Sequence, residues 1–295
     1  MFDIFKNRLE ITGTLWTVTA IRISAGRSTE PIGSDLPVIK DALGQPLIPG
    51  SSFKGALRSR LESFLRGILG NNRKLVANPA VNEEWSLTYQ ELSDFKEKNL
   101  KNIKQEEKED YLNNFIFSNT DLISHLFGSP WIASKFQVRD LTVLPDYWFG
   151  QYQERDGVAI DRDTETAADG KLYDYQVVPA GTPFEFKAVV ENAEDWELGL
   201  LMIGLHQFET EQIPLGGGRS RGLGVVRLDN LKMRWVDVED NPKFLLEYLK
   251  KLVREDETAY ENAADYKDEW VRKLIDHLEG LINQNSKVSN TESVE

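Results

Sequence analysis

The sequence contains no cysteine, and it has only three histidines in 295 residues. Without cysteine the chain can form no disulfide framework and no zinc site that depends on thiolate ligands. The histidines, His125, His206 and His277, lie far apart, and none has a neighbour at the spacing of metal ligands. No apolar run is long enough to cross a bilayer, and Met1–Phe5 lacks the basic-then-apolar pattern of a secretory signal. We therefore expect a cytoplasmic protein with no membrane partner.

Positive charge is also scarce: the chain has 35 Lys and Arg but 48 Asp and Glu, which gives a net charge of −13. The deficit is uneven: residues 1–70 carry nine basic and six acidic side chains, whereas residues 236–295 carry eight and fifteen. The overall charge predicts little non-specific affinity for free RNA at physiological salt. A basic groove focused on the N-terminal part remains compatible with nucleic-acid binding.

The most unusual segment is PLGGGRSRGLG at residues 214–224, with five glycines and two arginines. Glycine tolerates positive φ and lets the backbone approach a ligand closely, and exposed amides beside arginines suit a polyanion. A helix-like run precedes the segment and a strand-like run follows it, which is the reverse of the order around nucleotide-binding loops. Two interpretations remain open: a tight turn into the strand, or backbone binding of an anion. The candidate binding residues are Gly216, Gly217, Gly218, Arg219, Ser220 and Arg221.

Periodicity outlines a core of strands and helices. Alternating apolar and polar side chains predict a strand at residues 8–23. The Pro49-Gly50-Ser51-Ser52 segment predicts a turn and an N-cap before an amphipathic helix at 53–66. The later elements predicted are strands at 136–143 and 184–190, a helix at 196–211 and a strand at 223–229. This β-α-β-β-α-β order predicts an α+β, ferredoxin-like fold.

Three further segments are expected outside this core. Residues 71–128 predict a charge-dense helical insertion. The polar stretch at 145–182 is too long for a plain connection, which favours a projecting hairpin. Residues 236–295 predict acidic amphipathic helices that end in a disordered tail. We therefore divide the chain into a domain at 1–235 and an extension at 236–295.

Five segments, in order along the chain, resemble the RAMP superfamily. They are Ser34–Asp41 with Pro46–Arg58, Leu126–Gly128, Phe136–Asp140, Gly157–Arg162 and the glycine-rich residues 215–224. The closer resemblance is to the repeating backbone subunit of type III CRISPR effector complexes, and it implies an RRM-like core. The insertion at 71–128 and the helices after 240 depart from plain backbone subunits and resemble the longer versions of the type III-D branch. RAMP endonucleases that process precursor CRISPR RNA end soon after their glycine loop, so this chain does not match them.

The resemblance implies a subunit that binds crRNA and stacks with other effector subunits, including copies of itself, along the guide. Ser51, Ser52, Lys54 and Arg58 would then face guide phosphates. A helix N-terminus with hydroxyls and cations one turn apart is itself an anion site, and ordinary capping with solvated cations is the alternative. Residues 216–222 would lie against the same guide, 145–180 would form a thumb over the duplex, and Arg162 would contact RNA with Asp161 as its partner.

Asp35 occupies the position of the aspartate with which family members cut target RNA. A carboxylate there can accept the 2′-hydroxyl proton as that oxygen attacks its own phosphate, or hold hydrated Mg²⁺ nearby. The alternatives are that Asp35 caps a turn before Pro37, or that Asp41 acts instead. We therefore expect an Mg²⁺-dependent endoribonuclease; the main alternative is an architectural crRNA-binding subunit that does not cut. A protein-interaction module built on the acidic tail would leave the glycine loop unexplained.

Overall fold

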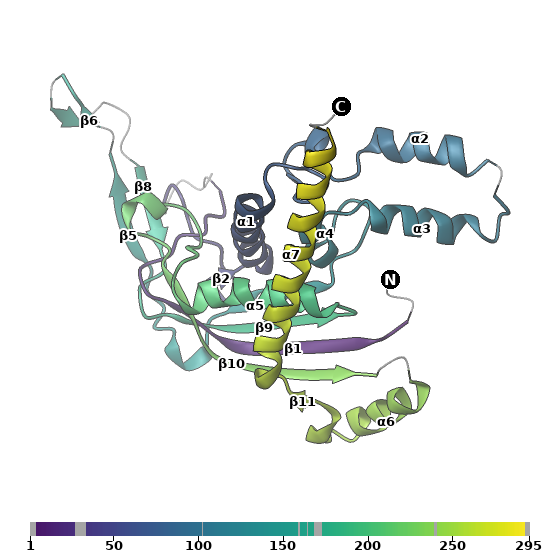
Figure 1. The fold of residues 1–295 in the computed structure, drawn as a ribbon. Coiled ribbons are helices and arrows are strands. Elements are labelled where there is room, and N and C mark those ends of the chain that lie inside the picture. Colours follow the sequence, from purple (N-terminus) through teal and green to yellow (C-terminus); the bar gives the residue numbers. More distant parts are fainter. Residues whose placement is uncertain are drawn as a thin grey trace.

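The computed structural model describes residues 4–26, 34–101, 103–158, 160–163, 165–167, 173–238 and 241–292, and the side chains of 160, 161, 167 and 285–292 are not described. The protein combines helices with antiparallel sheets, as an α+β fold does (Figure 1). One central sheet carries the core, and two hairpin-like projections leave it in different directions (Figure 1).

The central sheet has five strands in the order β11-β10-β1-β9-β3, and every neighbouring pair is antiparallel. The strands are β1 (Asn7–Thr17), β3 (Phe136–Val138), β9 (Pro183–Glu191), β10 (Val226–Asp237) and β11 (Glu261–Asn262). Strand β1 lies at the centre and pairs along most of its length with β9 and β10. Side chains alternate between a buried and a more exposed face, as in a sheet covered on one side.

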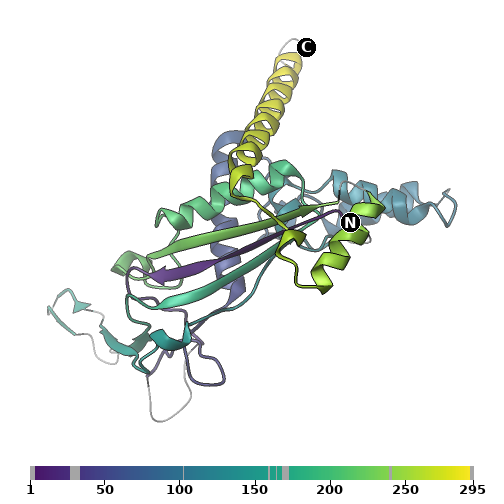
Figure 2. The same cartoon turned by 90° about the horizontal axis from the view of Figure 1, so that it is seen from below.

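Two helices cover one face of this sheet: α1 (Gly50–Leu69) and α5 (Asp195–Glu209) (Figures 1 and 2). Helix α1 is amphipathic, and its buried stripe recurs every four residues from Phe53. The ring of Phe53 packs between Phe186 of β9 and Phe208 of α5, with ring centroids 4.9 and 4.2 Å apart. The elements β1, α1, β3, β9, α5 and β10 follow one another in β-α-β-β-α-β order.

Three strand boundaries differ from the sequence prediction. The strand expected at 8–23 ends at Thr17, because the amides of Val18 and Thr19 both donate to the carbonyl of Val225 and the chain turns away from the sheet. The strand expected at 136–143 divides into β3 and β4 (Leu141–Thr142), and β4 pairs with β2 (Leu47–Ile48) instead. The strand expected at 223–229 begins at Val226, because Gly224 at φ +87° still belongs to the loop, and it runs on to Asp237.

The insertion at 71–128 is helical, as the sequence predicts. It contains α2 (Tyr89–Asn99), α3 (Lys108–Ser118), α4 (Leu122–Phe127) and a short 3₁₀ turn, η1 (Asn82–Glu84). Helices α2 and α3 form one of the two projections (Figure 1), and Phe95 and Phe115 stack between them with centroids 3.6 Å apart. Helix α4 returns the chain to the core through Ile123 and Leu126, which are fully buried.

The region at 145–182 forms the other projection. Strands β5 (Gln153–Gly157) and β8 (Tyr173–Val177) pair as a hairpin, β6 (Ile160–Asp161) and β7 (Thr166–Ala167) pair further out, and a 3₁₀ turn, η2 (Pro145–Tyr147), precedes them. The hairpin leaves the body at the end of the sheet where β1 ends (Figure 1).

The C-terminal part packs against the core. Its elements are α6 (Pro242–Val253), η4 (Glu257–Ala259), β11, η5 (Ala264–Tyr266) and α7 (Lys267–Glu292). Helix α7 crosses α5 at Gly199, where an added Cβ would lie 2.1 Å from the carbonyl oxygen of Trp270. Where we expected a disordered tail beyond Ile282, α7 continues to Glu292, and 293–295 lie outside the described residues. No helix in the described part of the chain is long and apolar enough to span a membrane.

Candidate nucleic-acid interface

A small apolar cluster joins four segments that lie far apart in the sequence. We call it the junction cluster; its members are Ala20, Leu36, Tyr173, Tyr175, Val177 and Leu223. Ala20 follows β1, Leu36 follows Asp35, the two tyrosines and Val177 belong to β8, and Leu223 lies in the glycine loop (residues 215–224). The cluster therefore holds the glycine loop and the Asp35 segment together at the base of the projecting hairpin.

Two glycines of the loop are required by close backbone packing. At Gly216, with φ +78°, an added Cβ would lie 2.2 Å from the carbonyl oxygen of Arg22. At Gly224, with φ +87°, it would lie 2.2 Å from the carbonyl oxygen of Leu215. The loop closes through reciprocal contacts: Leu215 N–H donates to Gly224 C=O, and Gly224 N–H donates to Ala20 C=O. The interpretation as a tight turn into the strand thus holds for these two positions.

Gly216→Ala should destabilise the folded chain by about 1–3 kcal/mol, because alanine meets both the positive φ and the Arg22 carbonyl. Gly222→Ala is the matched control, since Gly222 has φ +80° but nothing within 4 Å of an added Cβ. Urea denaturation of both variants measures the difference. Equal midpoints for the two variants would mean that the close approach at Arg22 costs nothing.

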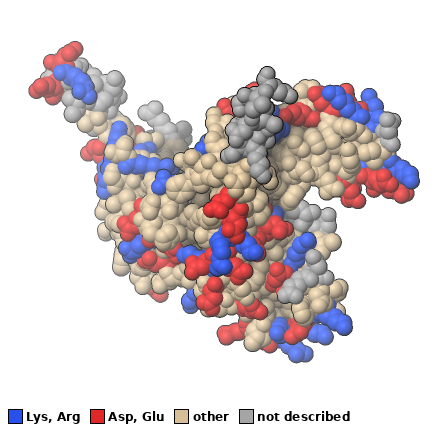
Figure 3. All heavy atoms as spheres, viewed as in Figure 1, with Lys and Arg blue, Asp and Glu red and all other residues tan. Residues whose placement is uncertain are grey.

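The middle of the loop is open to solvent. Arg219, Ser220 and Arg221 form a 3₁₀ turn, η3 (Arg219–Arg221), and all three side chains are exposed. The Arg219 Nε–H donates to the carbonyl of Gly216 at 3.1 Å, and Arg221 donates to the Tyr173 hydroxyl at 2.9 Å. These single contacts orient the two guanidiniums and leave most of their five donors for a ligand. On the face in Figure 3, basic side chains gather where the hairpin leaves the body.

A third arginine, Arg22, lies beside the loop and was missed by sequence reasoning. Its guanidinium carbon lies 4.8 Å from the ring centroid of Tyr175, and its carbonyl accepts the amide of Gly217. Its Nε is buried and has no hydrogen-bond partner among the described residues. The sequence around Arg22 does not mark it as a binding residue. It becomes part of the candidate site only because the glycine loop folds against it.

Asp35 is exposed and held against strand β8. Its amide donates to the Asp174 carboxylate at 2.8 Å, and its own carboxylate accepts the Asp174 amide at 3.4 Å. The next residue, Leu36, bridges to Tyr175 and accepts the amide of Gln176. The described hydrogen bonds of Asp35 therefore reach the hairpin base, not a turn before Pro37. Asp41, by contrast, holds its own turn by accepting the amides of Leu43 and Gln45, both at 2.9 Å.

The N-terminus of α1 differs from the sequence prediction. The helix begins at Gly50 with Pro49 as N-cap and no capping side chain, so Ser51 and Ser52 lie inside the first turn. The Gly50 amide donates to Asp140 at 2.8 Å, and neither serine hydroxyl has a hydrogen-bond partner among the described residues. Glycine at 50 is needed because an added Cβ would lie 2.5 Å from the carbonyl oxygen of Val138.

Lys54 and Arg58 point away from the glycine loop, toward β3 and α4. Lys54 donates to the Ser134 hydroxyl at 2.6 Å and to the Phe136 carbonyl at 3.0 Å. Burial, and then the charge of Arg58, lower the pKa of Lys54 from 10.5 to about 8. Arg58 donates to Glu62, to the Gly128 carbonyl and to Ser124. Contact of these two cations with phosphates stays a prediction.

A different face of α1 meets the glycine loop. A groove of about 390 Å³ runs between them, and it is lined by Gly55, Ala56, Ser59, Arg60, Ser63, Gln212, Ile213, Pro214 and Arg219. Each residue of a helix turns about 100° from the last, so Ser52, Ser59 and Ser63 share one face while Lys54 and Arg58 share another. Arg60, at the edge of the groove, was missed by sequence reasoning; helical phase relative to the buried stripe was the signal that could have found it.

Two remaining expectations concern the hairpin tip and a metal. Arg162 is exposed in the turn between β6 and β7, and the side chain of Asp161 lies outside the described residues. In the part of the chain that the structure describes, no group of three or more His, Asp and Glu side chains could hold a metal ion. At the junction, the carboxylates of Asp35 and Asp174 each accept the backbone amide of the other residue.

The chain is similar to known proteins over most of its length. The family model for the RAMP superfamily matches residues 14–227. The chain is 25% identical over 223 residues to the "CRISPR system Cms endoribonuclease Csm3" of Enterococcus italicus, covering 75% of this chain and 89% of that protein. It is 26% identical over 236 residues to the Csm3 protein of Mycobacterium tuberculosis, covering 77% and 89%. A shorter match to Csm3 of Methanocaldococcus jannaschii is 43% identical over 58 residues, which are 19% of this chain and 23% of that one. The chain therefore belongs to the RAMP superfamily and is a Csm3-like protein over most of its length.

Proposed function

We propose that this chain is a crRNA-binding backbone subunit of a type III CRISPR effector complex, with a ferredoxin-like, RRM-like core. The observation that carries the proposal is the junction cluster, which brings exposed Arg219 and Arg221 and the Asp35 segment to one place at the hairpin base. The guide backbone lies along the glycine loop and the groove beside α1. The hairpin at 145–182 is the thumb that folds over the duplex, with Arg162 contacting RNA.

The open face of the central sheet is a poor alternative surface for RNA. Arg8 pairs with Glu10 and Glu191, and Arg234 also pairs with Glu10. RRM modules stack bases on aromatic side chains of this face. Here Trp16 lies on this face, and its ring packs at right angles to the ring of Tyr147 with centroids 5.9 Å apart. Paired cations attract a polyanion weakly, which favours the glycine-loop side.

The proposed activity is cleavage of the guide-paired target RNA at Asp35. The 2′-hydroxyl oxygen attacks the adjacent phosphorus, the bond to the 5′-oxygen breaks, and the departing 5′-oxygen takes a proton from water, so that a cyclic phosphate and a 5′-hydroxyl result. The Asp35 carboxylate accepts or orients the 2′ proton. The hydrogen bonds to Asp174 hold the segment in place while the distorted RNA supplies the in-line geometry.

Magnesium fits this arrangement as an indirectly held ion. Mg²⁺ usually keeps several waters and is bound by one or two carboxylates together with substrate phosphates. Asp35 and Asp174 supply two neighbouring carboxylates, and RNA would supply the phosphate oxygens. When bound, the ion would stabilise charge on the reacting phosphate.

The second candidate is an architectural subunit that binds the guide and does not cut. The observation that favours it is that Asp35 is exposed and that its described hydrogen bonds go to Asp174 and not to a histidine. Both candidates share the same guide-binding surface and the same partners: crRNA, target RNA, and other subunits or further copies of this chain.

Guide RNA carrying 4-thiouridine, assembled with the full chain and irradiated, should cross-link to the glycine loop and to the Ser52–Ser63 face of α1. These surfaces flank the groove, whereas the α2–α3 projection carries a dense mixture of charges away from it. Mass spectrometry of the cross-linked peptides identifies the sites, and the α2–α3 peptides serve as the internal control. Cross-links confined to α2, α3 or the open sheet face would refute the proposed path.

A further inference from the structure

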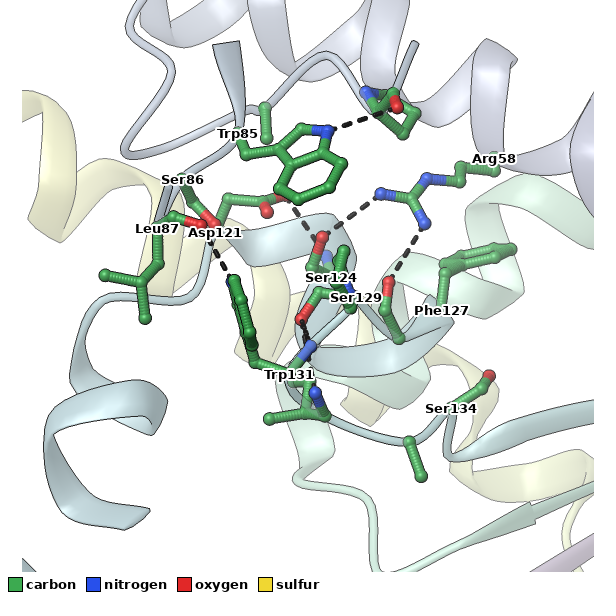
Figure 4. Close-up of a pocket in the computed structure, with 16 residues that line it drawn as sticks. Arg58, Trp85, Ser86, Leu87, Asp121, Ser124, Phe127, Ser129, Trp131 and Ser134 are labelled. Carbon is green, nitrogen blue, oxygen red and sulfur yellow. Dashed lines mark hydrogen bonds between the residues drawn. The ribbon is translucent and has the colours of Figure 1, made fainter. Parts of the chain in front are cut away.

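The insertion at 71–128 helps to form a pocket that the proposed guide path does not use. The pocket has a volume of about 450 Å³, and it is lined by Arg58, Ala77, Pro79, Trp85, Ser86, Leu87, Asp121, Ser124, Phe127 and residues 128–134. Pockets of this size commonly hold small organic ligands. Trp85 and Trp131 lie on one side, and Arg58 and Phe127 lie on the other (Figure 4).

The two indoles are fixed by their ring N–H groups. Trp85 donates to the carbonyl of Pro79 at 3.2 Å, and Trp131 donates to the carbonyl of Leu87 at 2.8 Å. Tyr89 packs against both rings, with centroids 5.4 Å from Trp85 and 4.6 Å from Trp131. With their polar atoms already bonded, what the indoles offer a ligand is flat apolar surface. Such surface suits a planar ring.

The pocket also contains a buried carboxylate oxygen without a partner. Asp121 is 1% exposed, and its Oδ1 accepts the Ser124 amide at 3.1 Å as the N-cap of α4. Its Oδ2 is buried and has no hydrogen-bond partner among the described residues. Leaving such an acceptor unpaired is costly, so a ligand N–H that reaches it would be favoured.

Arg58 places free donors close to that acceptor. Three of its five N–H groups go to Glu62, Gly128 and Ser124, which leaves two. Because Arg58 and Asp121 both hydrogen-bond to Ser124, the pocket presents a donor and an acceptor side by side. The charged residues that line the pocket are one cation, Arg58, and one anion, Asp121, so their charges favour a neutral ligand over a free cation or anion. A neutral planar ring that carries an N–H beside an acceptor atom fits best.

We propose that this pocket binds an unstacked nucleobase. The base stacks on the tryptophan side, donates an N–H to Asp121 Oδ2, and accepts from Arg58 through a carbonyl or ring nitrogen. The inference rests on the proposed RNA-binding function, and it gives the helical insertion a role in holding one base of the bound RNA. It also assigns Arg58 to a base and not to a phosphate.

The test uses the full chain labelled with ¹⁵N, because Trp85 and Trp131 each give one indole N–H resonance, assigned with Trp85→Phe and Trp131→Phe. Titration with GMP, AMP, CMP and UMP should shift both resonances saturably for at least one nucleotide, and ribose 5-phosphate, which lacks a base, should not. Asp121→Asn keeps a capping acceptor but replaces the free oxygen with a donor, so binding should weaken about tenfold or more. Asp256→Asn, which alters a solvent-exposed cap on η4, should bind like the unchanged chain.

Three outcomes would overturn the assignment: no shift with any nucleotide, equal shifts with ribose 5-phosphate, or unchanged affinity in Asp121→Asn. Shifts produced by N-acetylarginine amide but by no nucleotide would also overturn it, and would assign the pocket to a partner's side chain. Because the titration needs no guide, its failure alongside normal cross-linking of the glycine loop would reject the pocket alone. Failure of the cross-linking would reject the guide path itself.

Discussion

Asp35→Ala should abolish cleavage of target RNA at the positions this subunit covers, with guide binding unchanged. Loss of a group that moves a proton in the transition state costs about 10²–10⁴-fold in rate. Guide binding should persist, because Asp35 is exposed and its carboxylate is negatively charged, so it does not attract the guide phosphates. The measurement compares cut sites on labelled target RNA in the reconstituted complex with Mg²⁺.

Two further variants separate chemistry from anchoring. Asp35→Asn retains an oxygen that can accept the Asp174 amide but loses the charge, so it should be as inactive as the alanine variant. Asp41→Ala is the matched control, since Asp41 holds a turn of its own, and it should cut normally. Unchanged cutting by Asp35→Ala would reject Asp35 as the catalytic residue, and normal cutting by Asp41→Ala as well would then favour the architectural role.

Replacing Arg219 and Arg221 together with alanine should weaken guide retention and flatten its dependence on salt. Each phosphate contact on single-stranded RNA contributes about 0.7 to the slope of log K against log salt, so loss of two should lower the slope by about 1.4. Both side chains are exposed and each makes a single described hydrogen bond, so the fold should tolerate the change. Guide binding measured across a salt series gives the slope.

The matched control for this pair is Arg227→Ala with Arg234→Ala, which also removes two charges. Arg227 pairs with Asp229 and Glu211, and Arg234 pairs with Glu10, so neither is available to a polyanion. The control should leave the slope unchanged. If the control lowers the slope as much as the glycine-loop variant does, the guide lies on the open face of the sheet and not along the glycine loop.

Sequence periodicity predicted the type and order of the core elements but not where strands stop. Side-chain alternation continues past Thr17, yet the backbone there leaves the sheet because Val18 and Thr19 bond to Val225, more than 200 residues away. The two-residue strand β11 has no sequence pattern of its own. It exists because the chain after α6 returns to Arg234 and Trp235.

The candidate site could be predicted in part. Composition singled out the glycine loop, and the family resemblance singled out Asp35. Asp174 could not be found, because it is 139 residues from Asp35 and only the packing of Leu36 on β8 brings them together. The unpaired oxygen of Asp121 could not be predicted either, since an aspartate immediately before a helix is normally explained by N-capping alone.

Helix α5 carries two glycines with separate structural roles. Gly204 admits Leu57 of α1, whose Cδ1 would lie 2.5 Å from an added Cβ, and Gly199 admits the backbone of α7 at Trp270. The family model matches residues 14–227, so the helix that requires glycine at 199 lies beyond the matched residues. A side chain at position 199 would thus push α7 away from α5 at Trp270. Glycine at 199 therefore ties the core helix α5 to the C-terminal helix, and removing α7 would expose a backbone notch on α5 at this position.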